Sequence, residues 1–445
     1  MLRTTVALAL LAACGAPAPL PHRDVELRDT RFAPASPPEG ESASKTEEIL
    51  RKQELTLDDV LLIADTHNPQ LEIERKNIDL ATAAIWDAKL YPNPSFVLEL
   101  EDYRTRDGAT IGRTQRTAGF NVPVVVGGRI EAATSLAEKE REAAAIHYVW
   151  LRREFLSGVK GAFVSVLAAR RNAELSRQTR DIAKSLHEVT KARFETTPPS
   201  IPEMELLKAA VSLAKAESDL KNAEKVEAVA VKTLHAAMGN IDFPIDRFAG
   251  ELHTKFTIPS LEALRGQLTA GHPLIEEANR HLEASELALD LAEAQAIPDL
   301  GFEAVAGKDG EDATIVEGGF SIPLPIFDRN QGKIMAAEIR IRQSKLQLQS
   351  VQNGLVLGLT DAYKTLVAAQ ERVASYKDEI LPKAEKALEQ TNDGYKAGKF
   401  TYLDVLDAQR TLAEARVAYA AALTDLNLAA SDLEKLTGSK LESIP

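Results

Sequence analysis

Hydrophobic and polar residues alternate with a period of two in four short segments of the chain. In the first segment, Phe96, Leu98 and Leu100 point to one side of an extended chain, and Glu99 and Glu101 point to the other. The other segments have Phe120, Val122 and Val124, then Leu300, Phe302 and Ala304, then Val316, Phe320 and Ile322 on the apolar side. This alternation predicts β-strands at about 95–103, 114–126, 299–307 and 313–324.

The predicted strands have the length of membrane-spanning β-strands, since each runs about 9–11 residues and would cross a bilayer when tilted. In that case their polar side, with Glu99, Glu101, Glu303 and Glu317, would line an acidic lumen. A half-buried sheet in a soluble protein alternates in the same way, so the pattern leaves both interpretations open. Four strands cannot close a barrel, and every strand edge in lipid must be paired. Membrane strands would therefore require several chains to share one barrel.

Long helical patterns follow each predicted pair of strands. From about residue 128 to 194 the chain has no proline, and a helix of that length spans roughly 100 Å. A second long pattern runs from Glu338 to Thr391, with a predicted kink at Pro382. The last helix carries an apolar residue every seven positions, at Val405, Leu412, Tyr419, Leu426 and Leu433. Three positions later stand four alanines and Leu436. Such a seam predicts a coiled coil in which the helix axes approach closely.

The chain is built from two similar halves that lie about 200 residues apart in the sequence. Asn68-Pro69 recurs as His272-Pro273, and the run from Gly119 to Pro123 recurs from Gly319 to Pro323. Because such landmarks recur in the same order, we predict a tandem duplication. Its halves are 54–240 and 257–438, with a linker at 241–256 and a C-terminal tail at 439–445.

The N-terminus has the features of a bacterial export signal. Arg3 precedes an apolar run of about eight residues, too short to cross a membrane, which ends in Leu11-Ala12-Ala13-Cys14-Gly15. This ending resembles a lipobox, in which the cysteine carries lipid, and Cys14 is the only cysteine in the chain. We therefore expect a signal peptide at 1–13 and a lipidated, proline-rich tether at 14–53. A plain signal peptide is the alternative.

Composition excludes several classes of function. With 53 basic and 66 acidic residues the formal charge is −13, and no basic block is available to bind nucleic acid. A single cysteine excludes an internal disulfide framework and a cysteine-based zinc site. The 8 histidines lack the spacing of metal ligands, and the chain has no P-loop, Gly-x-Ser-x-Gly or His-Glu-x-x-His motif. We therefore expect no cofactor, no metal site and no enzymatic activity.

The duplicated halves, the strand pairs and the alanine-seamed helices together resemble the TolC-type outer-membrane factor (outer membrane efflux protein) family. The resemblance covers about Leu55 to Gly438, and its most specific segment is Tyr395 to Gln409. It implies a mainly α-helical homotrimer whose twelve-stranded membrane β-barrel continues into a twelve-helix periplasmic α-barrel. Such channels are exit ducts of tripartite efflux pumps and type I secretion systems. The implied partners are outer-membrane lipid, a periplasmic adaptor and an inner-membrane RND pump.

The segment from Ile322 to Lys333 is similar to the same segment of CzcC-like outer-membrane proteins of heavy-metal efflux pumps. The first half departs from this segment at Val124 to Arg129, where it is shorter, so the assignment rests on one half. Heavy-metal cations are the favoured substrate, with drug or small-molecule efflux and type I protein secretion as alternatives. A periplasmic coiled-coil adaptor is the alternative from a different class, although an adaptor would carry one helical hairpin rather than two copies.

The resemblance also implies roles for residues near the tip of the second helical hairpin. Asp404 and Asp407 lie on one helix face and match the acidic pair that lines the periplasmic aperture of TolC-type channels. The tip itself contains Tyr395, Gly398 and Lys399, of which Tyr395 and Lys399 would hold neighbouring hairpins together. Thr401 and Asp404 also fit a helix-capping box, which is an alternative role for Asp404.

Overall fold

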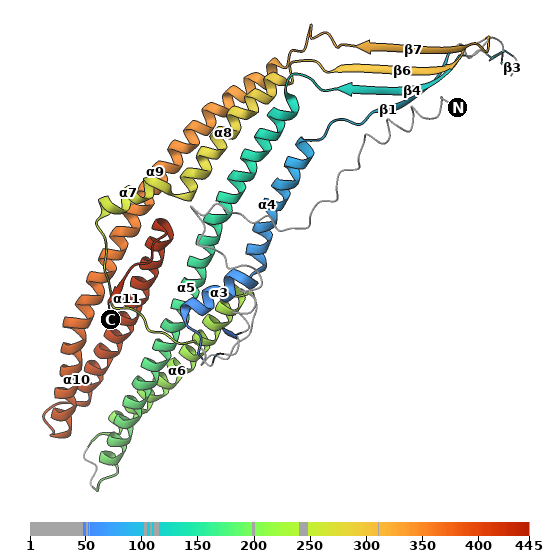
Figure 1. The fold of residues 1–445 in the computed structure, drawn as a ribbon. Helices are drawn as coiled ribbons and strands as arrows, with labels where there is room; N and C mark the ends of the chain where they lie inside the picture. The colour runs from blue at the N-terminus through green and yellow to red at the C-terminus, as the bar shows by residue number, and fades with distance from the viewer. Residues whose placement is uncertain are drawn as a thin grey trace.

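The computed structural model describes residues 48–444, except 50, 51, 53, 102–104, 107, 108, 111–114, 198–200, 240–247 and 310. The protein is elongated, with a β-sheet at one end and long helices that run from it to two hairpin tips at the other (Figure 1). The predicted signal peptide and Cys14 lie outside the described residues, as does the predicted tether apart from residues 48, 49 and 52.

Both halves of the chain contain the same order of elements. The first half has α3 (Leu57–His67), α4 (Pro69–Ala88), β1 (Ser95–Glu101), β4 (Gln115–Val124), α5 (Arg129–Phe194) and α6 (Glu203–Ala237). The second half has α7 (Leu261–Gly271), α8 (Pro273–Ala294), β6 (Leu300–Lys308), β7 (Thr314–Ser321), α9 (Gln331–Ser375), the π-helix η2 (Tyr376–Ile380), α10 (Leu381–Lys396) and α11 (Tyr402–Thr437). Two-residue strands form two further pairs, β2 (Thr105–Arg106) with β3 (Ala109–Thr110), and β5 (Lys255–Phe256) with β8 (Ser443–Ile444). The predicted helix-strand-strand-helix duplication is confirmed.

The four main strands form one antiparallel sheet in the order β1-β4-β6-β7. β4 and β6 join the two halves, with Asn121 opposite Glu303. The outer edges of β1 and β7 have no partner strand in the described part of the chain. The strand predicted to extend to residue 324 ends at Ser321, because Pro323 and Pro325 cannot donate ladder hydrogen bonds.

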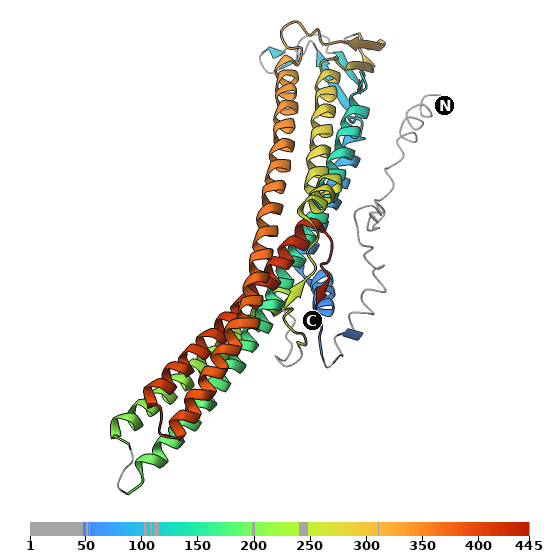
Figure 2. The same cartoon turned by 90° about the vertical axis from the view of Figure 1, so that its left-hand side faces the viewer.

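α5 is a single helix of 66 residues, as its proline-free sequence predicts. It packs against α4 and α8 toward the sheet and against α6 toward the far end (Figures 1 and 2). α11 packs against α10 to form the second hairpin, and its seam residues Val405, Leu412, Leu426 and Leu433 are at most 4% exposed. This burial agrees with the predicted coiled-coil seam. None of the described helices combines the length and the apolar character that crossing a lipid bilayer requires.

The second long helix differs from its prediction at its start and is interrupted near its end. α9 begins at Gln331 rather than near Glu338, because Asn330 adopts a left-handed backbone (φ 59°) and its Nδ2 donates to the Ala292 oxygen at 2.6 Å. This contact fixes the start of α9 against α8. The predicted kink corresponds to η2, which ends directly before α10, and Pro382 lies in the first turn of α10.

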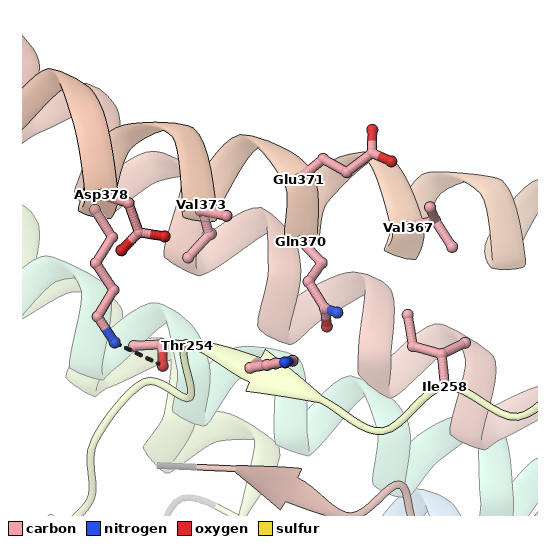
Figure 3. Close-up of a pocket in the computed structure, with 10 residues that line it drawn as sticks. Thr254, Ile258, Val367, Gln370, Glu371, Val373 and Asp378 are labelled. Atoms are coloured by element: carbon pink, nitrogen blue, oxygen red, sulfur yellow. Dashed lines mark hydrogen bonds between the residues drawn. The ribbon is translucent and has the colours of Figure 1, made fainter.

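A belt of short segments lies beside the long helices about half-way along the molecule (Figure 2). Asn427 of α11 fixes the linker between the halves, since its Nδ2 donates to the His253 oxygen at 2.9 Å and its Oδ1 accepts from the His253 nitrogen at 3.1 Å. Beside this contact lies a cavity of about 580 Å³ between the linker and the end of α9, lined in part by Thr254 and Gln370 (Figure 3). The linker predicted at 241–256 is described only from Phe248 onward.

Two apolar cores lie at this belt, one for each half. The first contains residues of α3, α5 and α6 together with Leu55 and Phe248. The second contains residues of α7, α9 and α11 together with Phe256. The belt therefore holds the two long hairpins in place relative to the sheet.

Candidate functional site

The two faces of the sheet differ in chemistry. The antiparallel register places all even-numbered residues of β1, β4, β6 and β7 on one face and all odd-numbered residues on the other. The even face is apolar, and Phe96, Leu98, Val316 and Phe320 on it are between 63% and 77% exposed. Phe96 also contacts Phe120 edge to face, with ring centroids 5.6 Å apart. A half-buried soluble sheet would cover such a face, so its exposure favours contact with lipid.

The odd face carries the four glutamates that were predicted to line a lumen. Glu99 and Glu101 of β1, Glu303 of β6 and Glu317 of β7 all lie on this face. Gln115 Nε2 also lies there and donates to Glu317 Oε1 at 3.4 Å. The register thus brings the four carboxylates to one side of the sheet, while their position in a lumen stays a prediction.

An ion pair joins the halves where the sheet meets the helices. Arg129, the first residue of α5, places Nη1 2.7 Å from Oδ2 of Asp299, which precedes β6. The turn before α5 is equally constrained, because Gly127 has φ 75° and a Cβ there would lie 2.8 Å from Ile297 Cδ1. The relative position of sheet and helices is therefore fixed by contacts between the two halves.

The second hairpin tip is a tight turn between α10 and α11. Gly398 has φ 74°, a conformation that favours glycine, and the Lys399 nitrogen donates to the Gly394 oxygen at 2.7 Å. A Cβ at Gly394 would lie 2.0 Å from the Phe400 ring, so Phe400 packs directly on this glycine. Gly398 and Lys399 therefore lie at the turn, and the Lys399 side chain is exposed.

Tyr395 connects the second hairpin to the first within one protomer. It is 3% exposed and packs in a cluster with Tyr402, Val405 and residues Leu186 and Ala209 of the first hairpin. Its ring lies 4.7 Å from the guanidinium carbon of Arg193 at the end of α5, a cation–π contact. Tyr402 meets the Tyr395 ring edge to face at 6.2 Å. Burial, with the nearby Tyr395 and Glu205, raises the pKa of Tyr402 to about 12.

Asp404 forms the capping box that the sequence offered as its alternative role. Its Oδ2 accepts from the Thr401 nitrogen at 2.8 Å and from the Thr401 hydroxyl at 2.7 Å, and its own nitrogen donates to that hydroxyl at 3.4 Å. These hydrogen bonds lower the pKa of Asp404. Asp407 is exposed, and its Oδ1 lies 3.4 Å from Nη2 of Arg410. Asp404 is thus engaged at the helix start, while Asp407 keeps an exposed carboxylate.

Sequence reasoning missed two members of the tip cluster, Arg193 and Tyr402. Arg193 lies in the last turn of α5, where a basic residue also interacts favourably with the helix dipole, so its sequence position gave a reason to overlook it. Tyr402 directly follows the capping residue Thr401, and an aromatic residue at the first helical position is a signal for a contact outside the helix. Their roles depend on the packing of one hairpin on the other.

Three of the histidines form specific contacts. His147 Nδ1 and His281 Nε2 lie 3.0 Å and 3.6 Å from the same oxygen of Glu277, Oε1. His272 is buried beside Trp150 and accepts from the Leu274 nitrogen at 3.2 Å. Burial, with the nearby Arg153, lowers the pKa of His272 to about 4. Among the described residues, no group of three or more His, Cys, Asp or Glu side chains is arranged to hold a metal ion.

The family model for "Outer membrane efflux protein" matches residues 62–240 and 264–439, one match in each half. The chain belongs to the outer membrane efflux protein family. This outer membrane efflux protein is 32% identical over 388 residues to the cobalt-zinc-cadmium resistance protein CzcC of Cupriavidus metallidurans, covering 86% of the chain and 90% of the relative. It is 23% identical over 290 residues to the nickel-cobalt-cadmium resistance protein NccC of Alcaligenes xylosoxydans xylosoxydans, covering 64% of each.

A solved structure shares the fold of this outer membrane efflux protein. The outer membrane protein VceC of Vibrio cholerae superimposes with a TM-score of 0.69, at 20% sequence identity, and the match covers 86% of this chain and 96% of VceC. Because the match covers most of this chain, the sheet and the two hairpins belong to one shared fold. The fold class expected from the sequence is confirmed.

Proposed function

We propose that this outer membrane efflux protein is the exit duct of a tripartite system driven by an RND-type inner-membrane pump, and that it carries heavy-metal cations. The observation that supports a duct is the sheet, which has an exposed apolar face and a carboxylate face, and whose two outer edges have no partner strand among the described residues. Three protomers would pair those edges into a twelve-stranded barrel with the glutamates inside. The similarity to CzcC, which extends over 90% of that cobalt-zinc-cadmium resistance protein, supports the substrate class.

Metal sensitivity tests this function directly. A strain that lacks the gene should become sensitive to cobalt, zinc or cadmium salts and should recover when the gene is supplied on a plasmid. Sensitivity to drugs should change less, because the proposed pump selects metal cations. A strain that becomes sensitive to drugs but not to metals would overturn the substrate assignment and favour drug efflux. Unchanged sensitivity to both, with impaired protein export, would favour type I secretion.

The duct is proposed to be anchored by a lipid on Cys14, in addition to its barrel. Labelling of growing cells with radioactive palmitate should mark the wild-type protein, and the change Cys14→Ser should abolish the label. An unlabelled wild-type protein would contradict the anchor but would leave the duct itself intact, since the barrel spans the membrane without it.

The periplasmic aperture is proposed to lie at the second hairpin tip, with Asp407 as its main acidic residue. Asp404 accepts two hydrogen bonds from Thr401, whereas the Asp407 carboxylate is exposed beside Arg410. We therefore expect the change Asp407→Ala to reduce the cation selectivity of reconstituted trimers, and their block by divalent ions, more than Asp404→Ala does. Unchanged selectivity in the double variant would mean that the constriction lies elsewhere.

A further inference from the structure

Two basic side chains lie next to each other on the apolar face of the sheet, at the end farthest from the helices. Arg116 of β4 and Lys308 of β6 are direct partners in the antiparallel register. Both positions are even-numbered, so they share the face that carries Leu98 and Phe120, and both side chains are exposed. The register therefore concentrates positive charge at one edge of an otherwise apolar surface.

This pairing is unfavourable without an anion. Like charges that lie directly opposite in an antiparallel pair destabilise it, and a cation on a lipid-facing strand is costly near the bilayer centre. Lys308 Nζ donates to the main-chain oxygen of Asp312 at 2.6 Å, a neutral partner, and it forms no ion pair with another described residue. Among the contacts of the described residues, the Arg116 guanidinium has no ion pair. An anion held between the two side chains would offset their repulsion.

The two cations lie at the height expected of lipid head groups. Val124 ends β4 on the helix side, 124 − 116 = 8 positions from Arg116, which corresponds to about 27 Å of strand. A strand tilt of roughly 40° reduces this to about 21 Å, close to the apolar band of about 25 Å in outer-membrane barrels. Arg116 and Lys308 thus lie where the apolar band ends, on the side of the membrane away from the helices.

The surface directly below the basic pair suits an acyl chain. Ala118 and Ala306 are partners two positions nearer the helices, and they lie between Leu98 and Val316 on the neighbouring strands. Two small side chains flanked by two larger ones would leave room for an acyl chain beside the two cations. A ligand with a phosphate and an acyl chain would match both parts.

We propose that Arg116 and Lys308 bind a phosphate group of a lipid in the outer leaflet, with one site in each protomer. The guanidinium offers a planar fork of N–H donors that binds phosphate through two bonds, and the ammonium adds a compact charge. The acyl chains lie over Ala118 and Ala306. This inference rests on the proposed outer-membrane location, with the helices on the periplasmic side.

Lipid retention tests the site. Purified trimers are reconstituted in nanodiscs of phosphatidylcholine with a small fraction of diphosphoryl lipid A, and the bound lipid A is counted by native mass spectrometry. Each cation near a lipid surface contributes roughly five-fold, so Arg116→Gln with Lys308→Gln should weaken lipid A binding roughly 30-fold. The swap Arg116→Lys with Lys308→Arg keeps both charges and should retain most of the binding. Arg329→Gln with Lys333→Gln, at the helix end of the barrel, is the matched control and should bind as the wild type does.

Three results would overturn the proposal: equal lipid A retention by the double variant, equal retention of lipid A without phosphates, or displacement of lipid A by an equal concentration of inorganic phosphate. The last result would indicate a site for free phosphate. Migration of unboiled samples on gels shows whether each variant assembles, and where the double variant does not, Lys308→Gln alone is compared with the swap. A wild-type protein found outside the outer-membrane fraction would instead contradict the proposed function.

Discussion

The two helical hairpins of this protein come from duplicated halves, yet their tips are built differently. α11 begins after Thr401 with a complete capping box, whereas α6 begins after Pro202 with no side-chain cap. Tyr395 at the second tip is buried on the first hairpin, whereas Phe194 at the end of α5 is only half-buried. The two halves have similar packing at the belt, but their hairpin tips differ. The apolar residues of the second tip are buried by contacts with the first hairpin.

The largest expected effect comes from removing the contact between the hairpins. Tyr395→Ala should lower the free energy of unfolding by about 3–4 kcal/mol, because a buried aromatic ring and its contact with Arg193 are lost. Phe194→Ala, the matched change at the first tip, should cost less than about 1.5 kcal/mol because that ring is already partly exposed. Chemical unfolding of detergent-solubilised protein, followed by circular dichroism, measures both. Equal losses of unfolding free energy in the two variants would mean that both tips contribute equally to stability and would contradict the difference described above.

A second difference between the halves concerns the residue before α4 and α8, where Asn68 in the first half corresponds to His272 in the second. Each side chain accepts from a nitrogen two residues later, at 2.8 Å for Asn68 and 3.2 Å for His272. Because that contact uses Nδ1 as acceptor, the proton of neutral His272 lies on Nε2. Among the described residues, Nε2 has no hydrogen-bond partner and is buried.

The lowered pKa of His272, about 4, predicts sensitivity to acid. Between pH 6.5 and about 4 the unfolded chain binds a proton at this residue and the folded chain does not, so stability falls as the pH falls through this window. His272→Asn should leave stability at pH 7.5 nearly unchanged and remove up to about 3 kcal/mol of this loss. Unfolding curves at neutral pH and at about pH 4.5 measure the difference. The raised pKa of His281 changes the stability in the opposite direction as the pH falls. His281 is present in both the wild type and the His272→Asn variant, so its effect cancels.

A smaller effect is expected from removing the capping box of α11 and from creating one at the start of α6. Thr401→Ala removes the capping box and should cost about 1–2 kcal/mol, and it should also raise the pKa of Asp404 toward its ordinary value. Pro202→Thr would create a capping box with Glu205 at the start of α6. Its gain should be only about 0.5 kcal/mol, because the chain also loses the restraint that proline imposes on the unfolded state. A gain from Pro202→Thr that equals the loss from Thr401→Ala would show that the proline restraint is negligible.

Much of the architecture follows from local sequence. The alternation around Phe96 and Glu99 predicted the strands, and the proline-free run predicted α5, because both signals depend only on neighbouring residues. The predicted start of α9 was wrong because the actual start depends on a contact of Asn330 with Ala292 in another helix. The alternation could not show that β4 pairs with β6, since pairing between the two halves is a long-range property.

The candidate site was predictable to a similar degree. Its four glutamates could be assigned to one face once the strands were known, because side chains alternate along a strand. The pairing of Arg116 with Lys308 could not be predicted, since it requires the register between β4 and β6. The contact of Arg193 with Tyr395 could not be predicted either, because only the packing of the two hairpins brings these residues together. Local sequence patterns therefore predict the ranges of strands and helices and the faces of the strands. Contacts between distant segments can be found only from the structure.

A small effect is expected from the two buried tyrosine hydroxyls at the second tip. The hydroxyl oxygens of Tyr395 and Tyr402 are buried and have no hydrogen-bond partner among the described residues. An unsatisfied buried hydroxyl is costly, so Tyr402→Phe should raise the free energy of unfolding by up to about 1 kcal/mol, while the ring keeps its contacts with Tyr395. The same unfolding experiment measures it, with Tyr419→Phe, a partly exposed tyrosine on the same helix, as the control. A loss of stability would mean instead that the Tyr402 hydroxyl gains more inside the cluster than its burial costs, as it would through an internal water. The second tip would then be held by a polar contact as well as by its apolar packing, a further difference from the first tip.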